Sequence, residues 1–287
     1  MPGDVRCPKD LWNLPMSERI ANKAKVPRSR FNIDAYLHPS NERPGSFNVP
    51  GGYFLEDDPE AFDHGLFNIS PVEALWMDPQ QRKLLEVVYE AFESSGTTLE
   101  TVSGQKTGCF VGSFTFDFQH MAQKESDFRH AYVSTGVDTG ILGNRISYVF
   151  DLRGPRYDFP SRGKRYNMKN ATDRIYSLTV NTACSSSLYA LDLACKAIAS
   201  GECDSAVVGG TNLILTVDQQ MNTARLGVLS PTNQCHTFDD AADGYGRAEG
   251  VGALYIKPLS AAIRDGDPVR AVIRSTAASR HVVHPIC

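Results

Sequence analysis

The 287-residue sequence predicts an α/β layered fold. Segments with strand character alternate with segments whose apolar residues recur at helical spacing. Residues 205–211 form a short apolar run, which is typical of parallel strands that helices cover on both faces. With 41% hydrophobic residues, the chain can bury a substantial core in one large domain or two small ones.

The first third of the chain contains one strong helix prediction. Residues 1–60 are rich in Pro, Asn, Gly and charge, and are predicted to be mostly loop with one short helix at 11–21. The first clear helix is predicted at 78–94. Asp78 is expected to cap its N-terminus, and Gln81 to complete a capping box.

The later elements alternate between strand and helix. In chain order they are a strand at 106–118, a helix at 138–150, a strand at 178–182, a helix at 185–200, and strands at 205–211, 251–259 and 269–276. The residues between 156 and 176 interrupt this pattern.

Composition narrows the function. The net charge of -4 carries no basic excess of the kind that nucleic-acid binding needs. The N-terminus has no apolar signal region, and no apolar run is long enough to span a membrane, so a cytoplasmic protein is expected. The seven cysteines are scattered and never spaced C-x-x-C, which indicates reduced thiols.

Cys184 stands where the predicted strand at 178–182 meets the predicted helix at 185–200. Unpaired N–H groups and the positive end of the dipole gather at a helix N-terminus, and both favour a thiolate. A thiolate there can attack a thioester, while the backbone N–H of Cys184 can donate to the oxyanion that forms. This context favours a nucleophile but leaves open an inert cysteine, which is the preferred interpretation for Cys195 and Cys203.

Two other motifs are weaker. The glycine-dense run 243–252 has Glu249 where a dinucleotide loop needs glycine, and it precedes a strand, so a tight, closely packed turn near a site is predicted instead. Cys235-His236 and the pair His281 and His284 have no second cluster at ligand spacing, so no metal site is predicted.

Several motifs together resemble the β-ketoacyl synthase (ketosynthase) family, in the family's own order. The central one is Val-Asn-Thr-Ala-Cys-Ser-Ser-Ser-Leu around Cys184, which is similar to the family's active-site sequence. The others lie at 30–34, 77–82, 143–148, 227–231, 243–250 and 262–274. Thr-Phe-Asp-Phe-Gln at 115–119 most resembles fungal highly reducing polyketide synthases.

The resemblance implies a thiolase-like fold, with an N-terminal half and an incomplete C-terminal half, at the start of a modular, homodimeric synthase. It implies that Cys184 accepts the growing acyl chain from an acyl carrier protein. Malonyl on the carrier's phosphopantetheine arm then loses CO2 and attacks that acyl thioester, in an acyltransferase reaction of the 3-oxoacyl synthase type. No metal and no redox cofactor is implied.

The sequence departs from the family in three places, which divides it into a ketosynthase region at 1–278 and an aberrant tail at 279–287. The chain begins at the family's Pro-Gly, without the strand that precedes it. Residues 156–176 have no counterpart in the family. Deleting them joins the flanks cleanly, which suggests a retained intron, with a real surface insertion as the alternative.

The third departure concerns the catalytic histidines. The family's His-Gly-Thr-Gly and Asn-x-Gly-His segments do not occur, and His281 and His284 match neither. An inactive fragment is therefore the main alternative to a working enzyme. A cysteine hydrolase, which would need His236 as its base, is a third interpretation.

Overall fold

The computed structural model describes residues 1–17, 19–40, 42–124, 130–154 and 177–278. Strands and helices alternate along much of the chain, so the α/β prediction is confirmed. The predicted insertion at 156–176, the tail at 279–287 and both of the tail's histidines lie outside the described residues.

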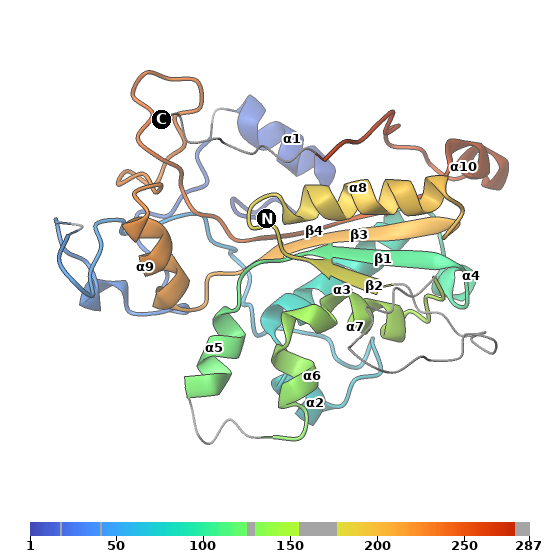
Figure 1. Ribbon diagram of the computed structural model, residues 1–287, viewed down its shortest axis with the longest axis horizontal. Helices are drawn as coiled ribbons and strands as arrows, with labels where there is room; N and C mark the ends of the chain where they lie inside the picture. The colour runs from blue at the N-terminus through green and yellow to red at the C-terminus, as the bar shows by residue number, and fades with distance from the viewer. Residues whose placement is uncertain (18, 41, 125–129, 155–176, 279–287) are drawn as a thin grey trace, which may run out of the picture. The chain divides into compact units, whose positions relative to one another are not determined.

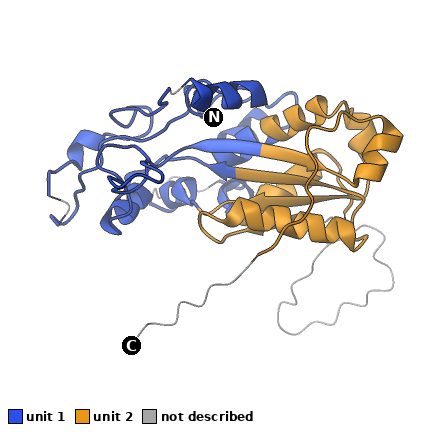
Figure 2. Cartoon of the chain, turned by 90° about the horizontal axis from the view of Figure 1, so that it is seen from above, with its two compact units in different colours: residues 1–85, 115–139, 211–252 blue, residues 86–114, 140–210, 253–287 orange. Residues whose placement is uncertain are grey.

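The chain divides into two compact units, which Figure 2 shows in different colours. Unit 1 comprises residues 1–85, 115–139 and 211–252, and unit 2 comprises residues 86–114, 140–210 and 253–287.

Four strands form a sheet in the order β2-β1-β3-β4. Their bounds are β1 Thr107–Gly112, β2 Ser177–Val180, β3 Ser205–Asn212 and β4 Gly250–Ile256. Strand β1 is parallel to both neighbours, with Cys109 opposite Ser177 on one side and Val207 on the other. Every residue of β1 is buried, as expected for a parallel strand covered on both faces.

Helices cover this sheet within unit 2. Figure 1 shows α8, Ser186–Ala199, along one face and α7, Leu142–Val149, against the other. Phe110 of β1 packs in one cluster with alanines of α8, which are small enough to bring the helix close to the strands. The other described helices of this unit are α4, Leu99–Val102, and α10, Leu259–Asp265, which ends at Gly266 in the left-handed conformation.

Unit 1 has short helices joined by long loops. They are α1 Pro8–Met16, η1 Ile33–Ala35, α2 Pro71–Leu75, α5 Asp117–Lys124, α6 Val133–Val137 and α9 Val217–Arg225. Its main core cluster includes Phe47, Phe54 and Ile214, all completely buried. Helix α3, Pro79–Ser94, begins in unit 1 and ends in unit 2, and η2, Thr139–Ile141, directly precedes α7.

The cap predicted for α3 is half right. The Asp78 carboxylate accepts a hydrogen bond from the Gln80 N–H at 2.8 Å, as a capping residue should. The capping box is wrong, because the Gln81 side chain donates to the Gly136 carbonyl at 2.8 Å instead. The Asp78 N–H donates to the same carbonyl, so α6 supplies the acceptor that a capping box would have provided.

Three other predictions need correction. The strand predicted at 106–118 ends at Gly112, and Phe118 lies in α5. The alternating phenylalanines had suggested a longer strand. The segment 269–276 is not a strand: its side chains are mostly exposed, and none of the described strands pairs with it. The helix expected at 11–21 is α1, which begins at Pro8 and ends at Met16.

Candidate active site

Cys184 lies in the turn between the end of β2 and the start of α8, where the sequence placed it, and its side chain is exposed. The carboxyl ends of parallel strands are where open α/β sheets place their ligand sites. Because α8 begins two residues later, the thiol stands beside the N-terminus of a 14-residue helix, at the positive end of its dipole. The turn therefore offers an accessible thiol in a setting that favours negative charge.

The turn is held by the hydroxyls of the residues that follow Cys184. Ala183 has a φ of +56°, a left-handed conformation that is uncommon for any residue except glycine. The Ser186 Oγ accepts from the Thr182 N–H at 2.9 Å and donates to the Ala183 carbonyl at 2.5 Å. The Ser185 Oγ donates to the Thr182 carbonyl at 2.7 Å. The residue before Cys184 thus has defined partners on both sides.

Two glycines let the start of α8 approach the sheet. A Cβ on Gly112, the last residue of β1, would lie 2.4 Å from the Ser187 nitrogen, which is too close for any side chain. A Cβ on Gly210 of β3 would lie 3.1 Å from the Ser187 Cβ. The helix start therefore rests directly on the strand ends, and this fixes the position of the turn in front of it.

The other described cysteines have different surroundings. Burial raises the pKa of Cys109 to about 12 and that of Cys203 to about 11, so both remain neutral thiols. Burial also raises the pKa of the half-buried Cys195. These surroundings are consistent with the inert packing role expected for Cys195 and Cys203. Cys7 and Cys235 are exposed, like Cys184.

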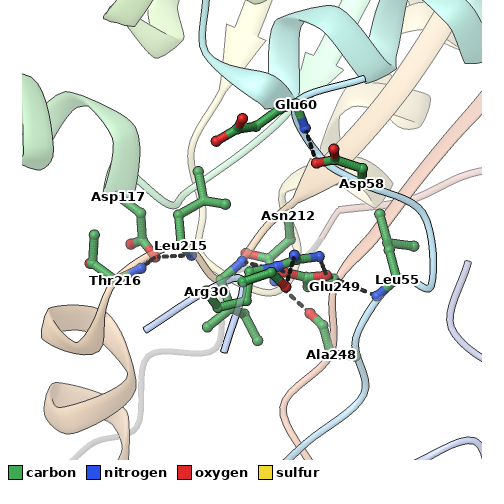
Figure 3. Close-up of polar contacts among 12 residues, drawn as sticks. Arg30, Leu55, Asp58, Glu60, Asp117, Asn212, Leu215, Thr216, Ala248 and Glu249 are labelled. Carbon is green, nitrogen blue, oxygen red and sulfur yellow. Dashed lines mark hydrogen bonds and ion pairs between the residues drawn. The ribbon is translucent and has the colours of Figure 1, made fainter. Parts of the chain in front are cut away.

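A buried ion pair, shown in Figure 3, organises unit 1. Arg30 donates from Nε and Nη2 to the two carboxylate oxygens of Glu249 at 2.7 and 2.8 Å. The side chains of this pair are 2% and 0% exposed. The same carboxylate accepts the Leu55 N–H at 2.8 Å and the Ile214 N–H at 3.1 Å. With four donors, this buried charge is fully compensated, and it joins four distant segments.

Asp117 is a second buried acid in unit 1. One of its carboxylate oxygens accepts the N–H groups of Leu215 and Thr216 at 2.9 and 3.1 Å, just before α9 begins (Figure 3). Burial raises the pKa of Asp117, and the Thr216 N–H and the nearby charge of Arg247 partly oppose that rise. Burial lowers the pKa of Arg247. These groups shape the loops of unit 1 and lie outside the Cys184 turn.

The glycine-dense run is closely packed, as predicted, but it is not a turn: it is extended, with bridges at Tyr245 and Ala248, and leads into β4. A Cβ on Gly244, whose φ is +140°, would lie 2.5 Å from the Ser230 nitrogen. A Cβ on Gly246 would lie 2.4 Å from the Tyr53 ring. His236 is half-buried in unit 1, and its carbonyl accepts the Asp239 N–H at 3.1 Å. A base role for His236 stays a prediction.

In the described parts of the chain, no three His, Cys, Asp or Glu side chains gather as a metal site would require. Over the same residues, no helix has the length and apolar character needed to cross a bilayer.

The sequence predicted where Cys184 lies but not the hydrogen bonds that surround it. It gave no role to Ser186, which holds the turn through two hydrogen bonds. Arg30 and Glu249 both lay within recognised motifs. Their pairing was not predictable because they lie 219 positions apart, and the available signal was a lone acid within a glycine-rich run.

Comparison with known families gives a match over most of the chain. The model of the β-ketoacyl synthase N-terminal domain matches residues 1–161 and 176–262. The matched ranges include Cys184 and the strands on either side of it. They omit 162–175, which lies within the predicted insertion.

Similar curated proteins are fungal polyketide synthases. The chain is 59% identical over 281 residues to the reducing polyketide synthase DEP5 of Alternaria brassicicola, covering 98% of the chain and 11% of that protein. It is 53% identical over 279 residues to the highly reducing polyketide synthase rstn3 of Aspergillus nomiae, covering 96% and 10%. The chain thus spans about a tenth of the length of these relatives.

Similar solved structures are ketosynthase domains. The oxazolomycin ketosynthase domain of Streptomyces albus superposes with a TM-score of 0.76 at 33% identity, over 91% of this chain and 42% of that one. The module 6 ketosynthase of the bacillaene synthase of Bacillus subtilis gives 0.72 at 31% identity, over 91% and 39%. These matches confirm the thiolase-like fold that the motifs implied, and they cover less than half of each solved chain.

Proposed function

The chain belongs to the β-ketoacyl synthase family, as its N-terminal domain, and from that premise we propose that Cys184 is the acyl-accepting nucleophile of a polyketide synthase. One observation carries the proposal. Cys184 is exposed at the strand-to-helix turn that the family motif occupies, beside the N-terminus of α8. That position supplies access for a thioester and a favourable field for a thiolate.

In the loading step, the Cys184 sulfur attacks the carbonyl carbon of an acyl thioester on an acyl carrier protein. A carbon–sulfur bond to Cys184 forms as the bond to the carrier's phosphopantetheine sulfur breaks, and the released thiolate takes up a proton. The Cys184 N–H is the proposed donor to the oxyanion that develops between these events. This step asks only for groups that the turn provides.

Condensation is the second step that we propose. We propose it for a protein as long as the relatives, which are about ten times the length of this chain. Malonyl on the carrier loses CO2, and the resulting carbanion attacks the acyl carbon on Cys184. A carbon–carbon bond forms, and the thiolate of Cys184 leaves. The classification as an acyltransferase of the 3-oxoacyl synthase type rests on this step.

Loading without condensation is the second candidate. It is favoured by one observation: none of the seven histidines stands in a His-Gly-Thr-Gly or Asn-x-Gly-His segment. Such segments supply the histidines that polarise malonyl and stabilise its enolate in the family, so these 287 residues on their own are expected to load the thiol and to turn it over slowly.

The test uses the purified chain, an acyl carrier thioester and intact-mass measurement. We expect one acyl adduct, lost in Cys184→Ala and retained in Cys235→Ala, which removes another exposed cysteine. Release of CO2 from malonyl carrier together with a ketoacyl product would support condensation. An adduct without CO2 release would support loading alone. No adduct on the wild-type chain would contradict both candidates.

We also propose that the functional form is a cytoplasmic homodimer, which the family resemblance supports. Among the described strands, β2 is at one edge of the sheet, the position from which a strand can pair with one of a second chain. Light scattering coupled to size exclusion tests the dimer, and a monomer at micromolar concentration would contradict it for this chain.

A further inference from the structure

The strained residue in front of the nucleophile needs something to hold it. A non-glycine residue in the left-handed region costs free energy and persists only where its surroundings impose it. Ala183, at φ +56°, directly precedes Cys184, so its conformation sets the direction in which the Cys184 side chain leaves the turn. Whatever fixes Ala183 therefore also orients the thiol.

The Ser186 hydroxyl is placed to do this. It accepts from the N–H of Thr182, the residue before Ala183, at 2.9 Å, and it donates to the carbonyl of Ala183 itself at 2.5 Å. The Thr182 N–H and the Ala183 carbonyl are thus held to one buried oxygen, since Ser186 is only 4% exposed. The Ala183 N–H is held separately, by the Asn181 Oδ1 at 3.3 Å. A buried hydroxyl in two such bonds has little freedom to turn.

The neighbouring serines are placed differently. The Ser185 Oγ bonds to the carbonyl and hydroxyl of Thr182 and makes no contact with Ala183 among its hydrogen bonds. Ser187 is exposed and packs against Gly210 of β3. Of the three consecutive serines, Ser186 alone bridges both sides of the strained residue.

Ser186 is itself held in place by the sheet. The carbonyl carbon of Ser186 would lie 2.6 Å from a Cβ on Gly112, so the first turn of α8 touches the end of β1. A line of contacts then runs from β1 through Ser186 and Ala183 to Cys184, all within unit 2.

We propose that Ser186 is a positioning residue that orients the Cys184 thiol by clamping the left-handed Ala183 peptide. This inference rests on the proposed function for its consequence in acyl loading. Its consequence for the reactivity of the thiol is separate, because a small alkylating reagent needs no carrier protein or acyl chain.

The test compares wild type with Ser186→Ala, with Ser186→Thr, which keeps a hydroxyl, and with Ser187→Ala as the matched control. The rate of alkylation by iodoacetamide is read at Cys184 by peptide mass spectrometry, with Cys235 as the internal reference. Acyl loading from a carrier thioester is measured in parallel. Circular dichroism confirms that each variant is folded, and alkylation in guanidinium gives the intrinsic rate.

We expect Ser186→Ala to lower the rates of alkylation and of acyl loading at Cys184 by at least about fivefold. That factor corresponds to the lower end of the free-energy cost of holding a non-glycine residue in the left-handed region. Ser187→Ala should match wild type, and Ser186→Thr should recover part of the loss. In guanidinium all four chains should react alike. If Ser186→Ala is folded and reacts like wild type, the positioning role is wrong.

The two proposals fail in different ways. A wild-type chain that alkylates at Cys184 but takes no acyl group would contradict the proposed function, and the alkylation rates alone would still decide the role of Ser186. If Ser186→Ala does not fold, the alkylation rates of Cys184 in folded Ser186→Thr and Ser186→Cys decide the question. A slow rate in Ser186→Cys with a faster rate in Ser186→Thr supports the clamp, and equal rates in both variants contradict it.

Discussion

The Cys184 turn in unit 2 and the Arg30–Glu249 pair in unit 1 both hold loop backbone in a fixed shape, but by opposite means. The turn uses neutral hydroxyls and places an exposed side chain at the end of a helix. The ion pair uses two buried charges and four donors, and exposes neither side chain. A fixed backbone therefore does not by itself indicate a reactive site. The two regions differ in that only the turn presents an accessible reactive group, the Cys184 thiol.

This comparison predicts that the largest loss of stability will come from breaking the ion pair. Arg30→Met keeps an unbranched, apolar stem but leaves the Glu249 carboxylate buried without its cation, which should lower the free energy of unfolding by about 3–5 kcal/mol. Chemical denaturation followed by circular dichroism measures the change.

The matched control is Lys25→Met. Lys25 pairs with Asp34 at 2.8 Å, and both side chains are more than half exposed, at 61% and 58%. Its loss should cost no more than about 1 kcal/mol. Equal losses for Arg30→Met and Lys25→Met would show that burial of the pair in unit 1 has no energetic consequence.

An intermediate loss of stability is expected where the end of β1 contacts the start of α8, next to the Cys184 turn. Gly112→Ala would force the start of α8 away from β1, because the new Cβ would lie 2.4 Å from the Ser187 nitrogen. Overpacking of this kind costs about 1–3 kcal/mol, and it should also slow acyl loading on Cys184 because the turn moves with the helix. Thermal unfolding and loading rate are measured together.

Gly250→Ala is the control for that substitution. Gly250 lies in β4, and a Cβ there would meet nothing within 4 Å. Stability and loading should both stay near wild type. If Gly112→Ala loads as fast as Gly250→Ala, the position of the Cys184 turn does not depend on the contact between α8 and the end of β1.

Asp78 in unit 1 should give an effect that depends on pH. Burial raises the pKa of Asp78 from 3.8 to about 7, and hydrogen bonds from Gln80 oppose that rise. Between these two values the folded chain holds a proton that the unfolded chain has lost. The contribution of Asp78 to stability is therefore present below pH 3.8 and is lost as the pH rises to about 7.

Asp78→Asn should remove this pH dependence, which amounts to at most about 1.4 kcal/mol per pH unit. Denaturation midpoints measured across the acid to neutral range give the slope. Asp240→Asn changes an exposed carboxyl and should leave the slope in place. An unchanged slope in Asp78→Asn would assign the dependence to another group, with Asp117 the next candidate.

Local sequence signals predicted the central part of the fold well. The strand before Cys184, the helix after it and the buried strand that follows all appear within one or two residues of their predicted bounds. Each has a clear periodicity and a glycine or small residue at its end. Cys184 could be found for the same reason, since its position depends on adjacent elements.

Features that depend on distant residues were not predictable. Phe114, Phe116 and Phe118 alternate like a strand, yet β1 ends at Gly112, opposite the end of β2, which lies more than 60 residues away. The segment 269–276 has strand composition, and none of the described strands pairs with it. Whether 156–176 is an insertion stays a prediction.

The central place of β1 also has a consequence for how the chain is made. Its register partners on both sides come later in the sequence, beginning at Ser177 and Ser205. During synthesis at roughly 5–20 residues per second, this apolar strand is complete for several seconds before either partner exists. Pairings of such long sequence separation also form slowly. We therefore expect newly made chains to depend on chaperones until residue 212 has emerged from the ribosome.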